Sequence, residues 1–363
     1  MPKRRQVIYL GWHGFNNFGD DLLHETWKSA LGNPLEVAAP LTRRAHMVTA
    51  SQFLLHSLRR IDTERIVLLG GGTTIGFQNW AKHTRLALAY YSAQALVVAG
   101  AGAAASHDTF ALNLQSSDWR AWRNLPHVAL FGVRGPLTQK ECAHHWRTTS
   151  VIGDPALLYP LCVRRQRPQP ARPVVGVCLG ASPTSRFDIG AVADAVSAHL
   201  AHHPDHAVRV LQLSREDSDV ARELASRLDG TLVAFEGDVQ TIMESIAECS
   251  LLLSERLHGA VAGVACGVAT VPLAYASKCD DFWMSITGEA PVLHVGATSG
   301  QILEEIQRAT RPERAAVVAQ RVHALQQDLL HAVDLLRQWQ EGHISSQELI
   351  ALSRHATPAV LQS

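Results

Sequence analysis

Short apolar runs separated by amphipathic stretches recur along most of the chain. The runs are rich in Val, Leu, Ile and Ala, a pattern typical of strands buried on both faces of a parallel sheet. They lie at 7–10, 66–69, 95–99, 128–132, 149–152, 174–179, 207–212, 231–234, 251–253 and 269–273. Because strands that alternate with helices form βαβ units, the pattern predicts an α/β protein with parallel sheets.

A polar stretch with three prolines at 164–173 divides these runs into two groups and predicts a linker. We therefore predict two Rossmann-like domains, 1–163 and 174–299. From 300 to 363 the apolar residues recur at helical spacing, which predicts closing helices. Ligands of such sheets bind beyond the carboxyl ends of the strands, so these ends are where we look for chemistry.

The chain has 363 residues, of which 47% are hydrophobic and 18% charged, and this composition is typical of a globular protein. Lys and Arg together number 33, as do Asp and Glu, so no net positive charge attracts nucleic acid or an anionic membrane. The six cysteines form no CxxC pair, and no signal peptide or long apolar segment is present. These features predict a cytoplasmic protein with reduced cysteines and no nucleic-acid partner.

The segment 254–259, Ser-Glu-Arg-Leu-His-Gly, is the strongest candidate for chemistry. It follows the apolar run 251–253 and precedes a helix of small residues. A helix N-terminus carries N–H groups that favour an anion, and Arg256 can hold a carboxylate or phosphate with two parallel hydrogen bonds. His258 can donate a proton near neutral pH, and Gly259 permits close backbone approach. With Leu257 between them, these residues are predicted to bind an anionic substrate.

A purely structural role is the alternative for this segment. Arg256 can pair with Glu255 or with another surface carboxylate, and His258 can cap the helix. The context favours a ligand, because a turn, another apolar run at 269–273 and a polar stretch follow. Lys278 in that stretch is a candidate second cation, although a single Lys is more often solvated.

The glycine-rich segment 11–23 joins the first apolar run to a helix. Its glycine spacing is not that of a dinucleotide-binding loop. Asp20 is a candidate base or sugar ligand, and a helix cap is an equally good interpretation. Asp21 is better explained as first-turn charge that complements the helix dipole. Asn17 in the same loop is a candidate cleft residue.

Two further loops follow predicted strands. A triple glycine at 70–72 places Gly71 and Gly72 where backbone approaches a ligand, and Arg134 follows the run 128–132 just before a proline-led helix. The 19 histidines show no zinc-site spacing, and neither a P-loop nor a Gly-x-Ser-x-Gly motif occurs. We predict no metal and no bound cofactor.

Together these motifs resemble the polysaccharide pyruvyl transferase family. The matching pieces are 14–21, 70–72, Val133 with Arg134, 153–156, and above all 254–259 with the downstream Tyr275 and Lys278. The resemblance implies a GT-B-like fold of two Rossmann-like domains. It also implies transfer of pyruvate from phosphoenolpyruvate to two sugar hydroxyls, with Arg134, Arg256 and His258 holding the donor. One departure is that Gly135 and Thr138 stand where the family often has an acidic residue and a Ser.

The residues fit this chemistry in their own right. Phosphoenolpyruvate carries a carboxylate and a phosphate, which call for cations and a helix N-terminus. His258 is the predicted acid and Asp20 the candidate base. The acceptor is expected to be a cell-surface polysaccharide or its precursor, with membrane association at most peripheral through a lipid-linked acceptor. The alternatives are a GT-B nucleotide-sugar glycosyltransferase and a non-catalytic binding protein with the same cleft.

Overall fold

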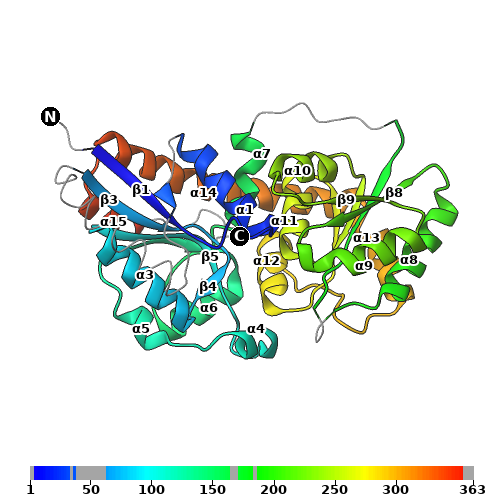
Figure 1. The fold of residues 1–363 in the computed structure, drawn as a ribbon, viewed down its shortest axis with the longest axis horizontal. Helices are drawn as coiled ribbons and strands as arrows, with labels where there is room; N and C mark the ends of the chain where they lie inside the picture. Colours follow the sequence, from blue (N-terminus) through cyan, green and yellow to red (C-terminus); the bar gives the residue numbers. More distant parts are fainter. Residues whose placement is uncertain (1–3, 33–35, 38–62, 164–170, 183–185, 355–363) are drawn as a thin grey trace. The chain divides into compact units, whose positions relative to one another are not determined.

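The computed structural model describes residues 4–32, 36–37, 63–163, 171–182 and 186–354 (Figure 1). Helices and strands alternate along the chain, and the chain forms two compact units. Unit 1 comprises Met1–Trp12, Thr26–Pro155 and Gln326–Ser363, and unit 2 comprises His13–Glu25 and Ala156–Leu325. Each unit has its own sheet and is described by itself.

Unit 1 is built on a six-stranded sheet in the order β2-β1-β3-β5-β4, with β6 also pairing with β5. All of these pairings are parallel. The strands are β1 (Arg4–Leu10), β2 (Glu36–Val37), β3 (Thr63–Leu69), β4 (Thr73–Ile75), β5 (Ala95–Ala103) and β6 (Val128–Val133). The central strand β5 is buried along its whole length, as expected for a strand covered on both faces.

Alternate side chains of the sheet face two different layers of helices. Ile8, Val67 and Val98 share one hydrophobic core with Trp80 and Trp122. These two indoles come from α3 (Gln78–Tyr90) and α5 (Trp119–Arg123), and α6 (Pro136–His145) joins the same core through its buried cysteine. The short helix α4 (Thr109–Leu114) precedes α5 in the chain.

The opposite side of this sheet contacts α1 (Phe18–Leu31), whose second half belongs to unit 1. The Trp27 indole is fully buried and donates a 2.7 Å hydrogen bond to the carbonyl of Gly70. A Cβ atom at Gly70 would overlap the rings of Tyr9 and Trp27. The first glycine of the triple-glycine loop is therefore required by packing against α1.

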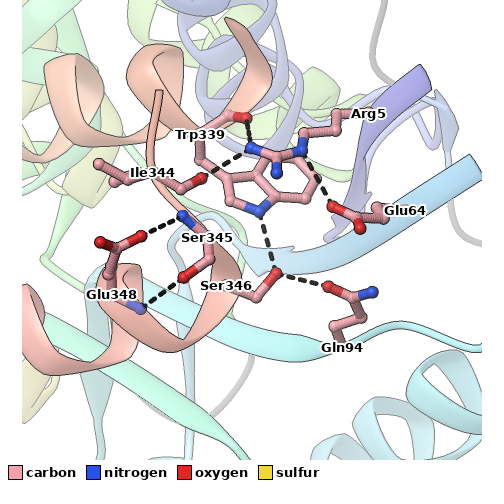
Figure 2. A network of polar contacts seen from close by, with 8 residues as sticks. All are labelled: Arg5, Glu64, Gln94, Trp339, Ile344, Ser345, Ser346 and Glu348. Atoms are coloured by element: carbon pink, nitrogen blue, oxygen red, sulfur yellow. Dashed lines mark hydrogen bonds and ion pairs between the residues drawn. The ribbon is translucent and has the colours of Figure 1, made fainter. Parts of the chain in front are cut away.

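The last helices of the chain, α14 (Pro312–Glu341) and α15 (Ser346–Ser353), reach the edge of the unit 1 sheet through a polar network (Figure 2). Arg5 of β1 donates hydrogen bonds to the carbonyls of Trp339 (2.6 Å) and Ile344 (2.7 Å) and pairs with Glu64 of β3 (2.9 Å). The buried Trp339 indole donates to the Ser346 hydroxyl at 3.0 Å. These bonds place α15 and the end of α14 in unit 1.

Unit 2 is built on a five-stranded parallel sheet in the order β11-β10-β7-β8-β9. The strands are β7 (Val174–Cys178), β8 (Ala207–Gln212), β9 (Thr231–Ala234), β10 (Leu251–Ser254) and β11 (Ala269–Pro272). One face forms a core with α8 (Ile189–His202), α9 (Ser218–Arg227) and α13 (Ser299–Ala309). The remaining elements are η1 (Pro155–Leu158), α7 (Tyr159–Cys162), η2 (Arg215–Asp217), α10 (Val239–Ala247), α11 (Leu257–Ala265) and α12 (Ser277–Thr287).

The predicted strands are confirmed with one exception. At 149–152 the chain forms no strand, and only Val151 pairs, in an isolated bridge with Val133. The left-handed Gly153 and the following Pro155 end this extended stretch immediately. Two short strands were not predicted, β2 and β4, because neither has an apolar run long enough to be recognised.

The two units differ from the predicted domains in two places. Residues 13–25 lie within 1–163 but belong to unit 2, and residues from 326 onward belong to unit 1 instead of forming a separate helical region. Contacts between residues far apart in the sequence cause both differences, and a local sequence pattern does not reveal them. Residues 164–170 of the predicted linker and residues 355–363 lie outside the described part of the chain.

Among the helices that the structure describes, none combines the length and the apolar character that a membrane crossing requires.

We expect Trp339→Ala to lower the free energy of unfolding by about 3–5 kcal/mol, because it removes a fully buried indole from unit 1. Urea denaturation measures the change. Leu352→Ala is the matched control, since Leu352 of α15 is 40% exposed and should change stability by about 0.5 kcal/mol or less. Equal effects of the two substitutions would contradict this packing of the C-terminal helices.

Candidate functional site

The segment predicted to carry chemistry leads from β10 into α11. Arg256 occupies the N-cap position of α11, and no side chain caps the helix. The Ser254 hydroxyl instead donates a 2.8 Å hydrogen bond to the carbonyl of Arg256 and so holds the turn from the inside. A Cβ atom at Gly259 would overlap this hydroxyl, which explains the glycine. Leu257, the first helical residue, is buried. Because no side chain caps α11, the partial positive charge of its N-terminus favours an anion.

Arg256 is held by a carboxylate that the sequence analysis did not single out. Its Nε donates to Asp217 Oδ2 at 2.9 Å, and its Nη2 donates to Asp217 Oδ1. Asp217 is fully buried at the end of η2. Burial lowers the pKa of Arg256, but the bonds and charge of Asp217 outweigh it and raise this pKa above its usual value. Arg256 is therefore a permanent cation with one edge already occupied.

Glu255 does not take the role of Arg256's partner. It is buried, and it accepts hydrogen bonds from the backbone N–H groups of Gly180 (2.7 Å) and Phe187 (3.1 Å). Burial raises the pKa of this carboxyl to about 7, although both backbone donors and the nearby Arg256 lower it. Arg256 therefore pairs with Asp217 and not with Glu255, and Glu255 binds backbone N–H groups instead.

His258 lies against the first turn of α1. A Cβ atom at Gly19 would overlap the Nδ1, Cγ and Cβ atoms of the His258 ring. Only glycine at this position leaves room for the imidazole. His258 is the second residue of α11 and Gly19 the second of α1, so two helix N-termini meet at this ring.

Asp20 lies beside the same histidine. Burial raises the pKa of Asp20 to about 6, while the charges of His258 and Lys278 lower it and the charge of Asp21 raises it further. Gly19, the residue before Asp20, lies against the His258 ring, and the charges of His258 and Lys278 both act on the Asp20 carboxyl. Asp20 was expected from the opposite domain, and the correction follows from the assignment of 13–25 to unit 2.

Lys278 is the second residue of α12, another helix without a side-chain cap. Its Nζ lies 4.9 Å from the centroid of the Tyr275 ring, within range of a cation–π interaction. Burial lowers the pKa of Lys278, but Tyr275 and Cys279 outweigh it and raise this pKa, so the ammonium is charged at neutral pH. Its positive charge also opposes that of Arg256, which places the two cations in the same neighbourhood.

The loop before α1 is anchored to the unit 2 sheet. The N–H of Phe18 donates to the carbonyl of Leu213 at 3.0 Å, and Asn17 pairs with Ser214 in an isolated bridge. Asn17 Oδ1 accepts the N–H of Gly19 at 3.1 Å, so Asn17 is the cap and Asp20 is not. Asp21 Oδ1 accepts the N–H of Gly14 at 2.5 Å. The capping interpretation of Asp20 is therefore wrong, and its carboxyl is left facing the cluster.

The other predicted residues lie in unit 1. Arg134 is fully buried at the end of β6, its Nη1 donates to the Thr73 hydroxyl at 3.2 Å, and its guanidinium lies against Gly102. Gly71 and Gly72 have positive φ values of 134° and 70°, and the Gly72 carbonyl accepts the N–H of Gly102 at 2.7 Å. Arg134 and the glycine loop therefore share one edge of this sheet.

The structure thus brings Asp20, Arg256, His258 and Lys278 together in unit 2, and Arg134 with Gly72 in unit 1. The important residue that the sequence analysis missed is Asp217. Asp217 lies in the polar run 214–219, which resembles a solvated helix start. No local pattern distinguishes its carboxylate, which is buried, from the other acidic side chains of this run. The Thr138 hydroxyl, at a position where the family often has Ser, accepts the N–H of Ala103 at 2.9 Å.

Within the described residues, no group of three His, Cys, Asp or Glu side chains is arranged to hold a metal ion. The expected lack of a metal cofactor stays a prediction.

The comparisons with known proteins agree with the motifs. The family model for polysaccharide pyruvyl transferases matches residues 17–277, well over half of the chain. The chain belongs to the polysaccharide pyruvyl transferase family. It is therefore a transferase, and the matched range contains the unit 2 cluster apart from Lys278, which follows it by one residue. No curated protein matches the chain.

Solved structures similar to this family member share its fold at low sequence identity. A Listeria monocytogenes protein assigned as a UDP-N-acetylglucosamine 2-epimerase has a TM-score of 0.63 at 10% identity, covering 95% of this chain and 98% of its own. UDP-GlcNAc 2-epimerase from Neisseria meningitidis has 0.54 at 11%, covering 92% and 99%. The glycotransferase of kitacinnamycin has 0.50 at 14%, covering 94% and 100%. These similarities support the predicted α/β fold, which is GT-B-like.

We expect Asp20→Asn to stabilise the protein more at alkaline than at acidic pH. The folded-state pKa of about 6 lies above the usual 3.8, so the buried charged form costs stability above pH 6, and this cost disappears as the pH falls toward 4. The gain in unfolding free energy over the wild type should be about 1 kcal/mol larger at pH 8 than at pH 5. Thermal unfolding across this range measures it.

Asp219→Asn is the control for this comparison, because the Asp219 side chain is 92% exposed and its difference from the wild type should not change with pH. A pH-independent effect of Asp20→Asn would show that the Asp20 carboxyl is solvated and would remove it from the cluster.

Proposed function

We propose that this family member transfers the pyruvyl group of phosphoenolpyruvate to two hydroxyls of a sugar and forms a ketal. The observation that carries the proposal is the cluster in unit 2. Three helix N-termini, those of α1, α11 and α12, contribute Asp20, His258 and Lys278 to one place, with Arg256 at the N-cap of α11. This set contains a cationic environment, a proton donor and a carboxylate, and the reaction needs all three.

The donor is a small, highly charged anion. Phosphoenolpyruvate carries a carboxylate and a phosphate, and both are groups that Arg, Lys and uncapped helix N-termini bind. Arg256 keeps its charge with its Nε–Nη2 edge paired to Asp217, and Lys278 and the dipoles of α11 and α12 add to the attraction within unit 2. Arg134 is a further donor ligand implied by the family pattern.

The proposed chemistry begins at the methylene carbon of the donor. His258 gives a proton to this carbon, which becomes a methyl group, and positive charge develops on the neighbouring carbon. A sugar hydroxyl attacks that carbon and loses its proton to Asp20. The phosphate then departs, and a second hydroxyl closes the ring. Of the two hydroxyl protons, one replaces the proton that His258 gave and the other leaves on the phosphate.

The pKa of Asp20 suits this role. A general base works best when its pKa lies near the operating pH, and burial raises this carboxyl to about 6. At neutral pH it is mostly ionised and ready to accept a proton. The charges of the adjacent His258 and Lys278 keep the pKa of Asp20 from rising further.

The acceptor in this proposal is a cell-surface polysaccharide or its precursor, and the reaction takes place in the cytoplasm without a bound cofactor. Asn17 is a candidate acceptor-side residue, and its side-chain oxygen also caps α1. Gly71 and Gly72 in unit 1 remain candidates for backbone contact with the sugar.

The deciding experiment follows phosphate release from phosphoenolpyruvate in the presence of β-linked galactosides and related sugars. Phosphoenolpyruvate should also raise the unfolding temperature, because a ligand of the native state stabilises it. Stabilisation by nucleotide sugars with none by phosphoenolpyruvate would favour a glycosyltransferase of the same fold. Donor binding without phosphate release from any sugar of the panel would favour a binding protein.

We expect His258→Ala to lower kcat by roughly 10²–10⁴-fold, which is the usual contribution of a positioned general acid. The affinity for phosphoenolpyruvate should fall by less than about tenfold, since Arg256 and Lys278 remain. Steady-state kinetics and calorimetric titration measure the two quantities. Full turnover in this variant would refute His258 as the acid.

Gly19→Ala tests the position of the same imidazole without removing it. The new methyl group would overlap the His258 ring, so the ring must move and kcat should fall by at least about tenfold. Gly300→Ala is the matched control, because a Cβ atom there would come no closer than 3.9 Å to any neighbour. Unchanged kcat in Gly19→Ala would contradict the contact between α1 and His258.

A further inference from the structure

Two buried carboxylates lie beneath the guanidinium of Arg256. Asp217 is fully buried and Glu255 is 2% exposed, although acidic side chains are almost never buried without partners. Asp217 comes from the turn η2 after β8, and Glu255 from the segment between β10 and α11. Both therefore reach Arg256 from the carboxyl end of the unit 2 sheet, from β8 and β10, which lie on either side of β7.

Asp217 joins two elements with one carboxylate. Its two oxygens accept Nε and Nη2 of Arg256, and Oδ1 also accepts the backbone N–H of Ala181 at 3.0 Å. Ala181 follows β7, so the same group that orients the guanidinium also holds the chain leaving the central strand of the sheet. Arg–carboxylate pairs of this bidentate kind fix the plane of the guanidinium as well as its position.

Glu255 holds the same stretch of chain at two further points, through the backbone N–H groups of Gly180 and Phe187. Gly180 lies directly beside the guanidinium, because a Cβ atom there would be 3.4 Å from Arg256 Nε. Glu255 therefore secures the backbone that packs against Arg256.

This arrangement leaves one side of the arginine for a ligand. The Nε–Nη2 edge is occupied, and among the described residues no hydrogen bond is made by Nη1. The Arg256 side chain keeps 24% of its surface exposed. An anion can thus meet Nη1 and the outer N–H of Nη2 but cannot bind the occupied edge.

Stability alone is a poor reason to keep these carboxylates. The desolvation penalty of a buried ion pair often equals or exceeds its Coulombic gain. Well-packed apolar residues of similar volume would therefore stabilise the fold at least as well. A fixed guanidinium, by contrast, loses less conformational freedom when it binds an anion.

From these contacts we infer that Asp217 is a positioning residue for the donor, which presents Nη1 of Arg256 to the substrate anion, and that Glu255 supports it by holding the adjoining backbone. The inference rests on the proposed function for the identity of the anion, phosphoenolpyruvate. The orientation of Arg256 itself does not depend on that identity.

The test compares Asp217→Asn with Asp219→Asn, two residues away, which lies 92% exposed in a surface pair with Arg222. In Asp217→Asn the Kd for phosphoenolpyruvate should rise at least tenfold and the KM for the sugar acceptor should stay within about twofold. Asp217→Glu should recover part of the lost affinity. Asp219→Asn should match the wild type. A lower unfolding temperature with unchanged donor Kd would overturn the inference and leave Asp217 a purely structural residue.

A second measurement separates this inference from the proposed function. In protein labelled with ¹⁵N-arginine, the Nε–H signal of Arg256, assigned by its loss in Arg256→Lys, should be protected from solvent exchange in the wild type and in Asp219→Asn, and unprotected in Asp217→Asn. If the wild type binds no phosphoenolpyruvate but shows this protection, the proposed function fails and the orientation of Arg256 by Asp217 stands. An unprotected signal in the wild type overturns the inference.

Discussion

The ion pair between Arg256 and the buried Asp217 is the constraint on which the unit 2 cluster depends. An arginine at the start of α11 would otherwise be a long, mobile side chain on a helix N-terminus. With its Nε–Nη2 edge bound to Asp217, it becomes a fixed donor with one direction left for a ligand. The same pairing keeps Arg256 charged, and Lys278 and the helix dipoles add further positive potential to the cluster.

The second constraint is the contact between α1 and α11. Gly19 lets the His258 ring lie directly on the backbone of α1, and this contact places Asp20 beside the histidine. Burial raises the pKa of Asp20 to about 6, and the charges of His258 and Lys278 limit this rise. The shift arises because helix starts, which carry partial positive charge, surround a carboxyl that is partly withheld from water.

Much of the fold is encoded in local patterns. Apolar runs such as 66–69 and 251–253 predict buried parallel strands because both faces of each strand are covered, and the motif at 254–259 marks a strand end followed by a helix start. The sequence does not show which distant elements meet. Asp217 looks like a solvated residue until the turn after β8 brings it to Arg256, which follows β10. The segment 13–25 joins unit 2 through backbone bonds to Leu213 and Ser214. Short strands such as β4 are invisible because three residues carry no periodicity.

The proposed reaction requires that the unit 2 cluster protonates phosphoenolpyruvate and transfers its pyruvyl group. The most direct measurement is to run the reaction in D₂O with a sugar acceptor and to analyse the product by ¹³C and ²H NMR. We expect one deuterium in the methyl group of each ketal formed, with one phosphate released per ketal. Phosphate release without a deuterium-labelled ketal, or no reaction of phosphoenolpyruvate with any sugar while a nucleotide sugar is consumed, would contradict it.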